Sequence, residues 1–205
     1  MQDPGRLHLI TDIRLQSVFS HLQLFQLAAK AEVPVVQFRE KFRTIKRVEE
    51  ALQMSELSKQ CKTRLVINDD PELALVLNAG VHVGNEDPDP SVWIGRLPMV
   101  GATVHSLAEL NKIRHLALDY IGVGPVFGTS SKQMSLPALG LQSLETIVHQ
   151  SPFPVIAIGN IQLSNLHSVL ETGVYGVAIL SAWCHQPDPY RAALEWNEKV
   201  SEFYT

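Results

Sequence analysis

Residues 9–17 read "LITDIRLQS", and this stretch decides between two α/β architectures. It completes the first hydrophobic β-run of the chain, residues 7–11, and contains no glycine. An open doubly wound sheet should carry a glycine-rich phosphate loop directly after its first strand. The lack of such a loop, together with eight β-runs along the chain, favours a (β/α)8 barrel.

Short β-rich runs recur along the chain, and helix-like stretches lie between them. The runs are "LHLIT" (7–11), "VVQFRE" (35–40), "RLVIND" (64–69), "VHVG" (81–84), "VGATV" (100–104), "YIGVGPVF" (120–127), "PVIAIGN" (154–160) and "YGVAILS" (175–181). Apolar spacing and capping residues predict helices over 24–32, 45–60, 69–80, 106–118 and 163–173. Alternating βα units without a long linker predict one TIM-barrel domain over residues 1–205. Its active site should lie at the C-terminal ends of the strands.

Composition argues against several classes of partner. The formal net charge is -4 and no run of basic residues occurs, so we expect no nucleic acid as partner. No apolar run approaches transmembrane length and the N-terminus carries no signal pattern, so we expect no membrane association. The two cysteines, Cys61 and Cys184, lie far apart, which is typical of reduced thiols in a cytoplasmic protein.

Polar side chains gather at the ends of the predicted strands. In the second run, "VVQFREK", side chains alternate between two faces, so Gln37, Arg39 and Lys41 share one face. Asn68 and Asp69 end the third run. Because parallel strands of a barrel end at one rim, these side chains should lie close together.

The acidic side chains at this rim suit a divalent cation. Asp69 and Asp87 follow neighbouring strands, and with the Asn68 amide they offer the oxygen ligands that Mg²⁺ prefers. Such an ion would hold a polyphosphate and stabilise a departing pyrophosphate. The cations available for the same ligand are Arg39, Lys41 and Lys132.

A second anion site is expected after the seventh and eighth strands. In these barrels, phosphate groups commonly bind backbone amides at that position, here "IGN" (158–160) and "LSA" (180–182). The fifth run adds a hydroxyl at Thr103, and the sixth leads into a turn that contains Thr129, Ser130, Ser131 and Lys132. Two phosphorylated substrates, one of them a diphosphate, would fit such a rim.

Six motifs together resemble one known family. They are "VQFREK", "VINDDPELAL", "GVHVGNED", "DYIGVGPVFGTSSK", "PVIAIGNI" and "GVAILSA", which resemble the thiamine-phosphate synthase (thiamine-phosphate pyrophosphorylase) family in order and spacing from residue 7 to 183. The resemblance implies a barrel enzyme that couples 4-amino-5-hydroxymethyl-2-methylpyrimidine diphosphate with a thiazole phosphate. It also implies a dissociative mechanism, in which pyrophosphate leaves before the thiazole nitrogen captures the pyrimidine cation, without a protein nucleophile.

The resemblance assigns roles to individual residues. The Mg²⁺ ligands would be Asp69 and Asp87, and the catalytic cations would be Arg39, Lys41 and Lys132. The set expected to contact the pyrimidine diphosphate or the thiazole phosphate comprises Gln37, Phe38, Arg39, Glu40, Lys41, Asn68, Thr103, Thr129, Ser130, Ser131, Lys132, Asn160, Leu180 and Ser181.

One departure from the family pattern concerns the thiazole phosphate. Asn160 in "AIGNI" stands where the family has a second glycine, so a side chain lies where a backbone amide should meet the phosphate. Asparagine adopts positive φ more readily than most residues. We therefore expect the turn to survive while the pocket narrows.

Two alternative functions stay open at this point. The thiazole tautomerase paralogue, an isomerase on the same barrel, tends to lose the metal carboxylates and carries a histidine where this chain has Pro125. A non-catalytic binder of thiamine precursors is supported by Asn160 alone. Because this chain retains Asp69, Asp87 and Lys132, the synthase is favoured. The sequence leaves the oligomeric state and the accepted thiazole variant open.

Overall fold

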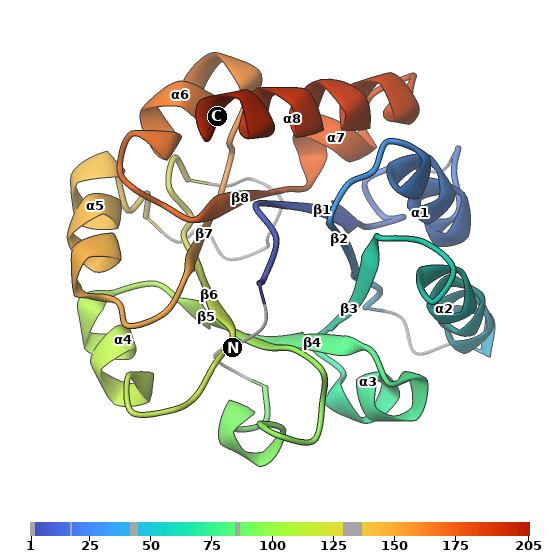
Figure 1. Cartoon of the computed structure of the whole chain (residues 1–205), viewed down its shortest axis with the longest axis horizontal. Coiled ribbons are helices and arrows are strands. Elements are labelled where there is room, and N and C mark those ends of the chain that lie inside the picture. The colour runs from blue at the N-terminus through green and yellow to red at the C-terminus, as the bar shows by residue number, and fades with distance from the viewer. Residues whose placement is uncertain (1–2, 17, 42–44, 85–86, 129–136) are drawn as a thin grey trace.

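The structure is a computed structural model that describes residues 3–16, 18–41, 45–84, 87–128 and 137–205. Eight parallel strands close into a barrel in chain order, with helices around the outside (Figure 1). The strands are β1 (Leu7–Thr11), β2 (Val35–Phe38), β3 (Arg64–Asn68), β4 (Gly80–Val83), β5 (Val100–Val104), β6 (Tyr120–Val123), β7 (Val155–Ile158) and β8 (Gly176–Ile179). The predicted (β/α)8 barrel is confirmed, and each strand overlaps one of the eight predicted runs.

Helices follow most of the strands. They are α1 (His21–Lys30), α2 (Ile45–Ser58), α3 (Pro71–Leu77), η1 (Pro90–Val92), α4 (Leu107–Ile113), α5 (Leu141–Gln150), α6 (Leu163–Leu170), α7 (Ser181–Cys184) and α8 (Pro189–Phe203), of which η1 is a single 3-10 turn. The five predicted helices are present with shifted ends, whereas α5, α7 and α8 were not predicted. Within the described ranges, no helix combines the length and the apolar character needed to cross a bilayer.

The ends of α3 show why a predicted boundary moved. The Asp70 side chain accepts a hydrogen bond from Leu73 N at 3.0 Å and Pro71 begins the helix, as the sequence indicates. The helix ends at Asn78, which takes the left-handed conformation with φ 51°, instead of at Gly80. Asparagine tolerates this conformation, so Asn78 ends the helix and no glycine is required for that purpose. Gly80 instead begins β4.

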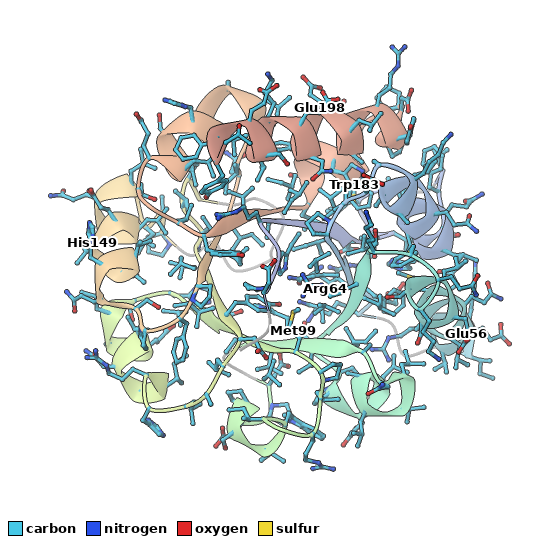
Figure 2. All side chains as sticks on the ribbon, viewed as in Figure 1. Glu56, Arg64, Met99, His149, Trp183 and Glu198 are labelled. Atoms are coloured by element: carbon cyan, nitrogen blue, oxygen red, sulfur yellow. The ribbon has the colours of Figure 1, made fainter. Side chains whose placement is uncertain are left out.

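Apolar residues form two separate clusters, one on each side of the strands. The larger cluster lies between the strands and the helices and includes Trp183 of α7, which lies outside the ring of strands near α8 (Figure 2). The smaller cluster fills the barrel interior with residues such as Val66, Met99 and Ile156. Ile10, Tyr120, Ile156 and Ala178 of this cluster also line the cavity at the strand ends, so the apolar interior directly adjoins the polar groups of the cavity.

His8 belongs to the barrel interior and is neutral there. Its Nε2 lies 2.9 Å from the Pro4 carbonyl oxygen, and its Nδ1 accepts from Gln37 Nε2 at 3.0 Å, so the ring is satisfied with one proton on Nε2. Complete burial disfavours the imidazolium and lowers the pKa of His8 to about 3. Below pH 6.5 the His8 side chain binds a proton in the unfolded chain, whereas in the folded chain it stays neutral down to about pH 3.

We therefore expect His8 to make the fold acid-sensitive. The free energy of unfolding should fall as the pH drops from 6.5 toward 3, by up to about 1.4 kcal/mol per pH unit from this group. Replacement His8→Asn should flatten that dependence, measured by urea unfolding at pH 7.5, 5.5 and 4.5. The matched control is His149→Asn, which removes an exposed histidine of α5. If the free energy of unfolding of His8→Asn depended on pH as steeply as that of the wild type, His8 would not be the group responsible.

Candidate active site

A cavity of about 440 Å³ opens at the C-terminal ends of the strands. Each strand contributes at least one residue to its wall, namely Ile10, Gln37, Asn68, His82, Thr103, Tyr120, Ile156 and Ala178 in the order β1 to β8. Enzymes with this barrel place their active sites at the same end. The cavity therefore lies where the sequence predicts the chemistry to be.

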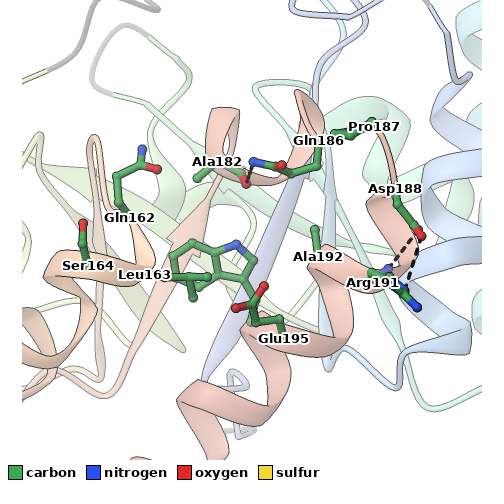
Figure 3. A pocket seen from close by; sticks show the side chains of 11 residues that line it. Gln162, Leu163, Ser164, Ala182, Gln186, Pro187, Asp188, Arg191, Ala192 and Glu195 are labelled. Carbon is green, nitrogen blue, oxygen red and sulfur yellow. Dashed lines mark hydrogen bonds and ion pairs between the residues drawn. The ribbon is translucent and has the colours of Figure 1, made fainter.

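A second cavity, of about 430 Å³, lies among the outer helices α6, α7 and α8 (Figure 3). Several polar groups of its wall are satisfied within that wall. Asp188 accepts from Arg191 N at 3.1 Å, and Gln186 Nε2 donates to the Ala182 carbonyl at 3.2 Å. The strand-end cavity is the better candidate because charged side chains from neighbouring strand ends, Arg39, Lys41 and Asp69, converge on it.

The alternation of β2 continues past the strand and decides which predicted residues reach the cavity. Gln37, Arg39 and Lys41 line it, as the period of two predicts. Phe38 and Glu40 lie on the opposite face, where Phe38 packs edge-on against the His21 ring and Glu40 Oε2 lies 3.3 Å from His21 Nε2. Phe38 and Glu40, both in the predicted substrate-binding set, therefore do not line the cavity.

Asp12, which the sequence reasoning missed, anchors Arg39. The carboxylate follows β1 and is almost fully buried, and it forms an ion pair with Arg39 Nη1. It also accepts from Arg14 Nη2 at 2.6 Å. Burial works against ionisation, but the hydrogen bonds from Arg14 and the charge of Arg39 outweigh it and hold the pKa of Asp12 below its ordinary value. The group is therefore a buried anion between two cations.

Asp69 and Asp87 face each other next to Gly84. Asp87 Oδ2 accepts from Gly84 N at 2.6 Å, and the two carboxyl groups share a hydrogen bond. A Cβ added to Gly84 would lie 3.2 Å from Asp87 Oδ2 and 3.8 Å from Asp69 Oδ1, so both side chains converge on this small residue. Asp69 also forms an ion pair with Lys41. The predicted proximity of the two carboxylates and Lys41 is thus present.

Ionisation of the two carboxyl groups is unequal. Burial and the neighbouring Asp69 carboxylate raise the pKa of Asp87 to about 6. Burial also disfavours the Asp69 carboxylate, but its hydrogen bond with Asp87 and its contact with Lys41 lower its pKa. A close acidic pair of this kind is the donor set that a Mg²⁺ ion uses when water and phosphate oxygens complete its shell. Among the described residues no group of three or more His, Cys, Asp or Glu side chains has metal-binding geometry.

Asn68 supports the acidic pair from the end of β3. With its amide nitrogen turned toward Asp69, it donates to Asp69 Oδ2 at 2.9 Å and to Asp69 Oδ1 at 3.2 Å. Asp69 itself has φ 62°, and its backbone N donates to the His82 carbonyl at 2.9 Å. The left-handed backbone and the amide contact together fix the direction of the Asp69 carboxylate.

A chain of polar side chains forms the floor of the cavity. Gln37 Nε2 lies 3.5 Å from Tyr120 Oη, which lies 3.1 Å from His82 Nδ1, and His82 Nε2 lies 2.9 Å from Thr103 Oγ1. Burial raises the pKa of Tyr120, so its hydroxyl keeps its proton. The floor is thereby a continuous set of donors and acceptors that ends at Thr103.

Two glycines make room for this floor. A Cβ at Gly101 would lie 2.2 Å from Cζ of Tyr120, and one at Gly122 would lie 2.9 Å from Cε1 of His82. Neither Tyr120 nor His82 is among the site residues predicted from the sequence. The available signal was a glycine within each of two neighbouring strands, which marks close approach by a large group.

The turns after β7 and β8 border the opposite side of the cavity. Asn160, Leu180 and Ser181 line it, and Asn160 has φ 51°, the left-handed conformation that the sequence predicts for this position. The Asn160 Oδ1 atom accepts from Gln162 Nε2 at 3.4 Å. The predicted site residues Thr129, Ser130, Ser131 and Lys132 lie outside the described residues.

The chain is similar to thiamine-phosphate synthases in sequence and in structure. A family model described as thiamine monophosphate synthase matches residues 7–183. The thiamine-phosphate synthase from Chloroflexus aurantiacus is 34% identical to this chain, over 96% of this chain and 93% of its own length. The thiamine-phosphate synthase from Archaeoglobus fulgidus is 35% identical, over 99% of this chain and 97% of its own length. The solved structure of thiamine phosphate pyrophosphorylase from Pyrococcus furiosus superimposes with a TM-score of 0.88 at 30% identity, covering 99% of this chain and 98% of that one.

The acidic pair should reduce stability when no divalent cation is present. Because the folded state holds the Asp87 proton up to about pH 6 and the unfolded state releases it near 3.8, wild-type stability is reduced as the pH rises through that window. Asp87→Asn keeps an oxygen acceptor for Gly84 N and removes the like charge. It should be more stable than wild type at pH 7.5 by a few tenths to about 1 kcal/mol, a range that allows for solvent screening.

The measurement is urea unfolding in EDTA at pH 7.5 and pH 4. The advantage of Asp87→Asn should shrink at the lower pH, where Asp87 is protonated in the folded wild-type protein. Asp188→Asn is the control, since it makes the same change at an exposed aspartate where asparagine can also cap α8. The same stability difference at both pH values would contradict the interpretation.

Proposed function

The chain belongs to the thiamine monophosphate synthase family, and on this premise we propose that its strand-end cavity couples two phosphorylated substrates with the aid of Mg²⁺. The substrates are hydroxymethylpyrimidine diphosphate and a thiazole phosphate, 4-methyl-5-(2-phosphooxyethyl)thiazole or its carboxylated form, and the products are thiamine phosphate and pyrophosphate. The observation that carries the proposal is the position of Arg39 and Lys41 beside the carboxyl groups of Asp69 and Asp87.

The bond changes are those of a dissociative transfer. The C–O bond between the pyrimidine methylene and the diphosphate breaks, and its electron pair leaves with pyrophosphate. The thiazole nitrogen then uses its lone pair to form the new C–N bond to the pyrimidine cation. The protein needs to supply position and charge stabilisation, because neither step forms a bond to a side chain.

The charges at the rim support a role for a divalent cation. Three acidic side chains alternate with three cations. Asp12 pairs with Arg14 and Arg39. Asp69 pairs with Lys41 and shares a hydrogen bond with Asp87. At neutral pH these charges nearly cancel, so a diphosphate would gain little net attraction. When bound by Asp69 and Asp87, Mg²⁺ would supply the positive charge that stabilises the pyrophosphate leaving group.

The protein groups around the diphosphate have complementary tasks. Arg39 offers a planar set of N–H donors that suits phosphate oxygens, and Lys41 offers a mobile point charge. Gln37 and Asn68 line the same wall, and their amides can bind polar edges of the pyrimidine. Lys132, which lies outside the described residues, stays a predicted contact of the leaving group.

We place the thiazole phosphate on the turns after β7 and β8. Asn160, Leu180 and Ser181 border the cavity there, and backbone amides at this position of the barrel are suited to phosphate. With this placement, the thiazole phosphate and the diphosphate would lie on different walls of one cavity. The thiazole ring would then lie between them, where its nitrogen can approach the pyrimidine methylene.

The buried thiol beneath the rim is not a nucleophile. Cys184 is almost fully buried, and its Sγ donates to the Ile10 carbonyl at 3.0 Å. Burial raises the pKa of Cys184 to about 12, so a thiolate does not form at neutral pH. This inert state supports a mechanism in which the substrates react directly with each other.

The proposal predicts Mg²⁺-dependent turnover of the two precursors to thiamine phosphate and pyrophosphate. Removing the metal with EDTA should abolish the reaction, and Asp69→Asn should lower kcat/KM by about 100-fold or more, because charge stabilisation by a metal is worth several kcal/mol. The readout is chromatographic detection of both products, with Asp188→Asn as the control. Metal-independent isomerisation of a thiazole carboxylate phosphate, with no coupling, would support a tautomerase instead.

A second prediction concerns Asn160. Because its φ of 51° suits glycine at least as well, Asn160→Gly should fold normally and widen the turn that faces the thiazole phosphate. We expect a several-fold lower KM for the thiazole phosphate and little change in KM for the pyrimidine diphosphate, measured by steady-state kinetics with each substrate varied. Equal changes in both KM values would place Asn160 elsewhere in the reaction.

A further inference from the structure

The Asp12 carboxylate lies where β1 and β2 reach the cavity rim. Arg39 N donates to the Thr11 carbonyl at 3.2 Å, so the pairing of the two strands continues one residue beyond Phe38. This backbone contact places the side chains of Asp12 and Arg39 next to each other. Arg39 lines the cavity, whereas Asp12 lies behind it and is 1% exposed.

Asp12 makes its side-chain contacts with two arginines. Its Oδ1 accepts from Arg14 N at 3.0 Å and from Arg14 Nε at 3.0 Å. Its Oδ2 accepts from Arg14 Nη2 at 2.6 Å and from Arg39 Nη1. A carboxylate is costly to bury unless such charged donors satisfy it. The site is therefore built around the two guanidinium groups.

The two arginines have different positions relative to solvent and cavity. The Arg14 side chain is 36% exposed and holds Asp12 with a two-pronged contact, while the Arg39 side chain is 12% exposed and touches Asp12 through Nη1. Arg14 neutralises Asp12, so Asp12 can hold Arg39 without cancelling its positive charge. The other N–H groups of Arg39 stay available to a ligand in the cavity.

We propose that Asp12, with its charge offset by Arg14, is a positioning residue that fixes the Arg39 guanidinium toward the diphosphate of the substrate. The inference rests on the proposed function, since it assumes that Arg39 binds the diphosphate. Arginine side chains lose much rotamer freedom when they bind, and an arginine already held in place loses less. Misplacing a charge-stabilising group also slows the reaction itself.

Replacing Asp12 separates positioning from simple charge effects. Asp12→Asn keeps the shape of the side chain and removes one negative charge near the cavity. If Asp12 contributed only its charge, the variant should bind anions more tightly than wild type. If it positions Arg39, the variant should bind pyrophosphate about tenfold more weakly, despite the gain in net positive charge.

The experiment measures binding of pyrophosphate in the presence of Mg²⁺ by isothermal titration calorimetry, together with steady-state kinetics for each substrate. We expect weaker pyrophosphate binding and a higher KM for the pyrimidine diphosphate in Asp12→Asn, with little change in KM for the thiazole phosphate. Asp188→Asn, the same change at the exposed pair with Arg191, should leave pyrophosphate binding unchanged. Unchanged or tighter pyrophosphate binding in Asp12→Asn would overturn the inference.

A double-mutant comparison tests whether Asp12 acts through Arg39. In an Arg39→Gln background, Asp12→Asn should cause little further loss of pyrophosphate binding, because the group that it positions is gone. A loss as large as in the wild-type background would show that Asp12 acts by another route and would overturn the inference.

Arg14→Gln provides a second variant in case Asp12→Asn does not fold. Arg14 is partly exposed, so its replacement should preserve the barrel, while the charge of Asp12 would then offset that of Arg39. Pyrophosphate should bind several-fold more weakly, and unchanged binding would contradict the neutralising role. If unaltered protein fails to bind pyrophosphate with Mg²⁺ at all, the proposed function is overturned together with this inference. If unaltered protein binds pyrophosphate and Asp12→Asn weakens that binding equally in the wild-type and Arg39→Gln backgrounds, only this inference is overturned.

Discussion

The ion pair between Lys41 and Asp69 joins two neighbouring strand ends at the point where they reach the cavity, and the proposed chemistry depends on it. It exists because β2 and β3 are adjacent parallel strands whose register pairs Phe38 with Ile67. Beyond these strands, the alternation of β2 directs Lys41 inward, and the left-handed backbone of Asp69 turns its carboxylate to the same side. A closed barrel fixes both strands, so the cation and the acidic pair stay in contact.

Polar groups of the interior carry a cost in stability that the apolar clusters offset. His8, Tyr120 and His82 are buried within the ring of strands, and each is satisfied by a neighbour that is also buried or lies at the cavity wall. The Asp69–Asp87 pair is held together although like charges repel. Proteins often accept such destabilisation where a site must be ready for a charged ligand. The arrangement is thus shaped by binding as much as by folding.

The sequence predicted the strands and the inward-facing cations because these follow from local periodicity. Eight β-runs give eight strands, and the period of two puts Gln37, Arg39 and Lys41 on one face. Phe38 and Glu40 belong to the set that the family resemblance implies, but they do not line the cavity, because the same period directs both side chains to the helix side. The proximity of Asp69 and Asp87 was predictable from barrel topology alone.

Contacts between distant segments explain what the sequence did not reveal. Asp12 was read as part of a loop without glycine, and its role depends on Arg39, which is 27 residues away. The most direct test of the central claim is a crystal structure with Mg²⁺ and pyrophosphate bound. The account predicts one metal ion held by Asp69 and Asp87 next to pyrophosphate, with Arg39 and Lys41 in contact with the phosphate oxygens. Pyrophosphate bound away from Arg39 and Lys41, or a metal that neither carboxylate touches, would contradict it.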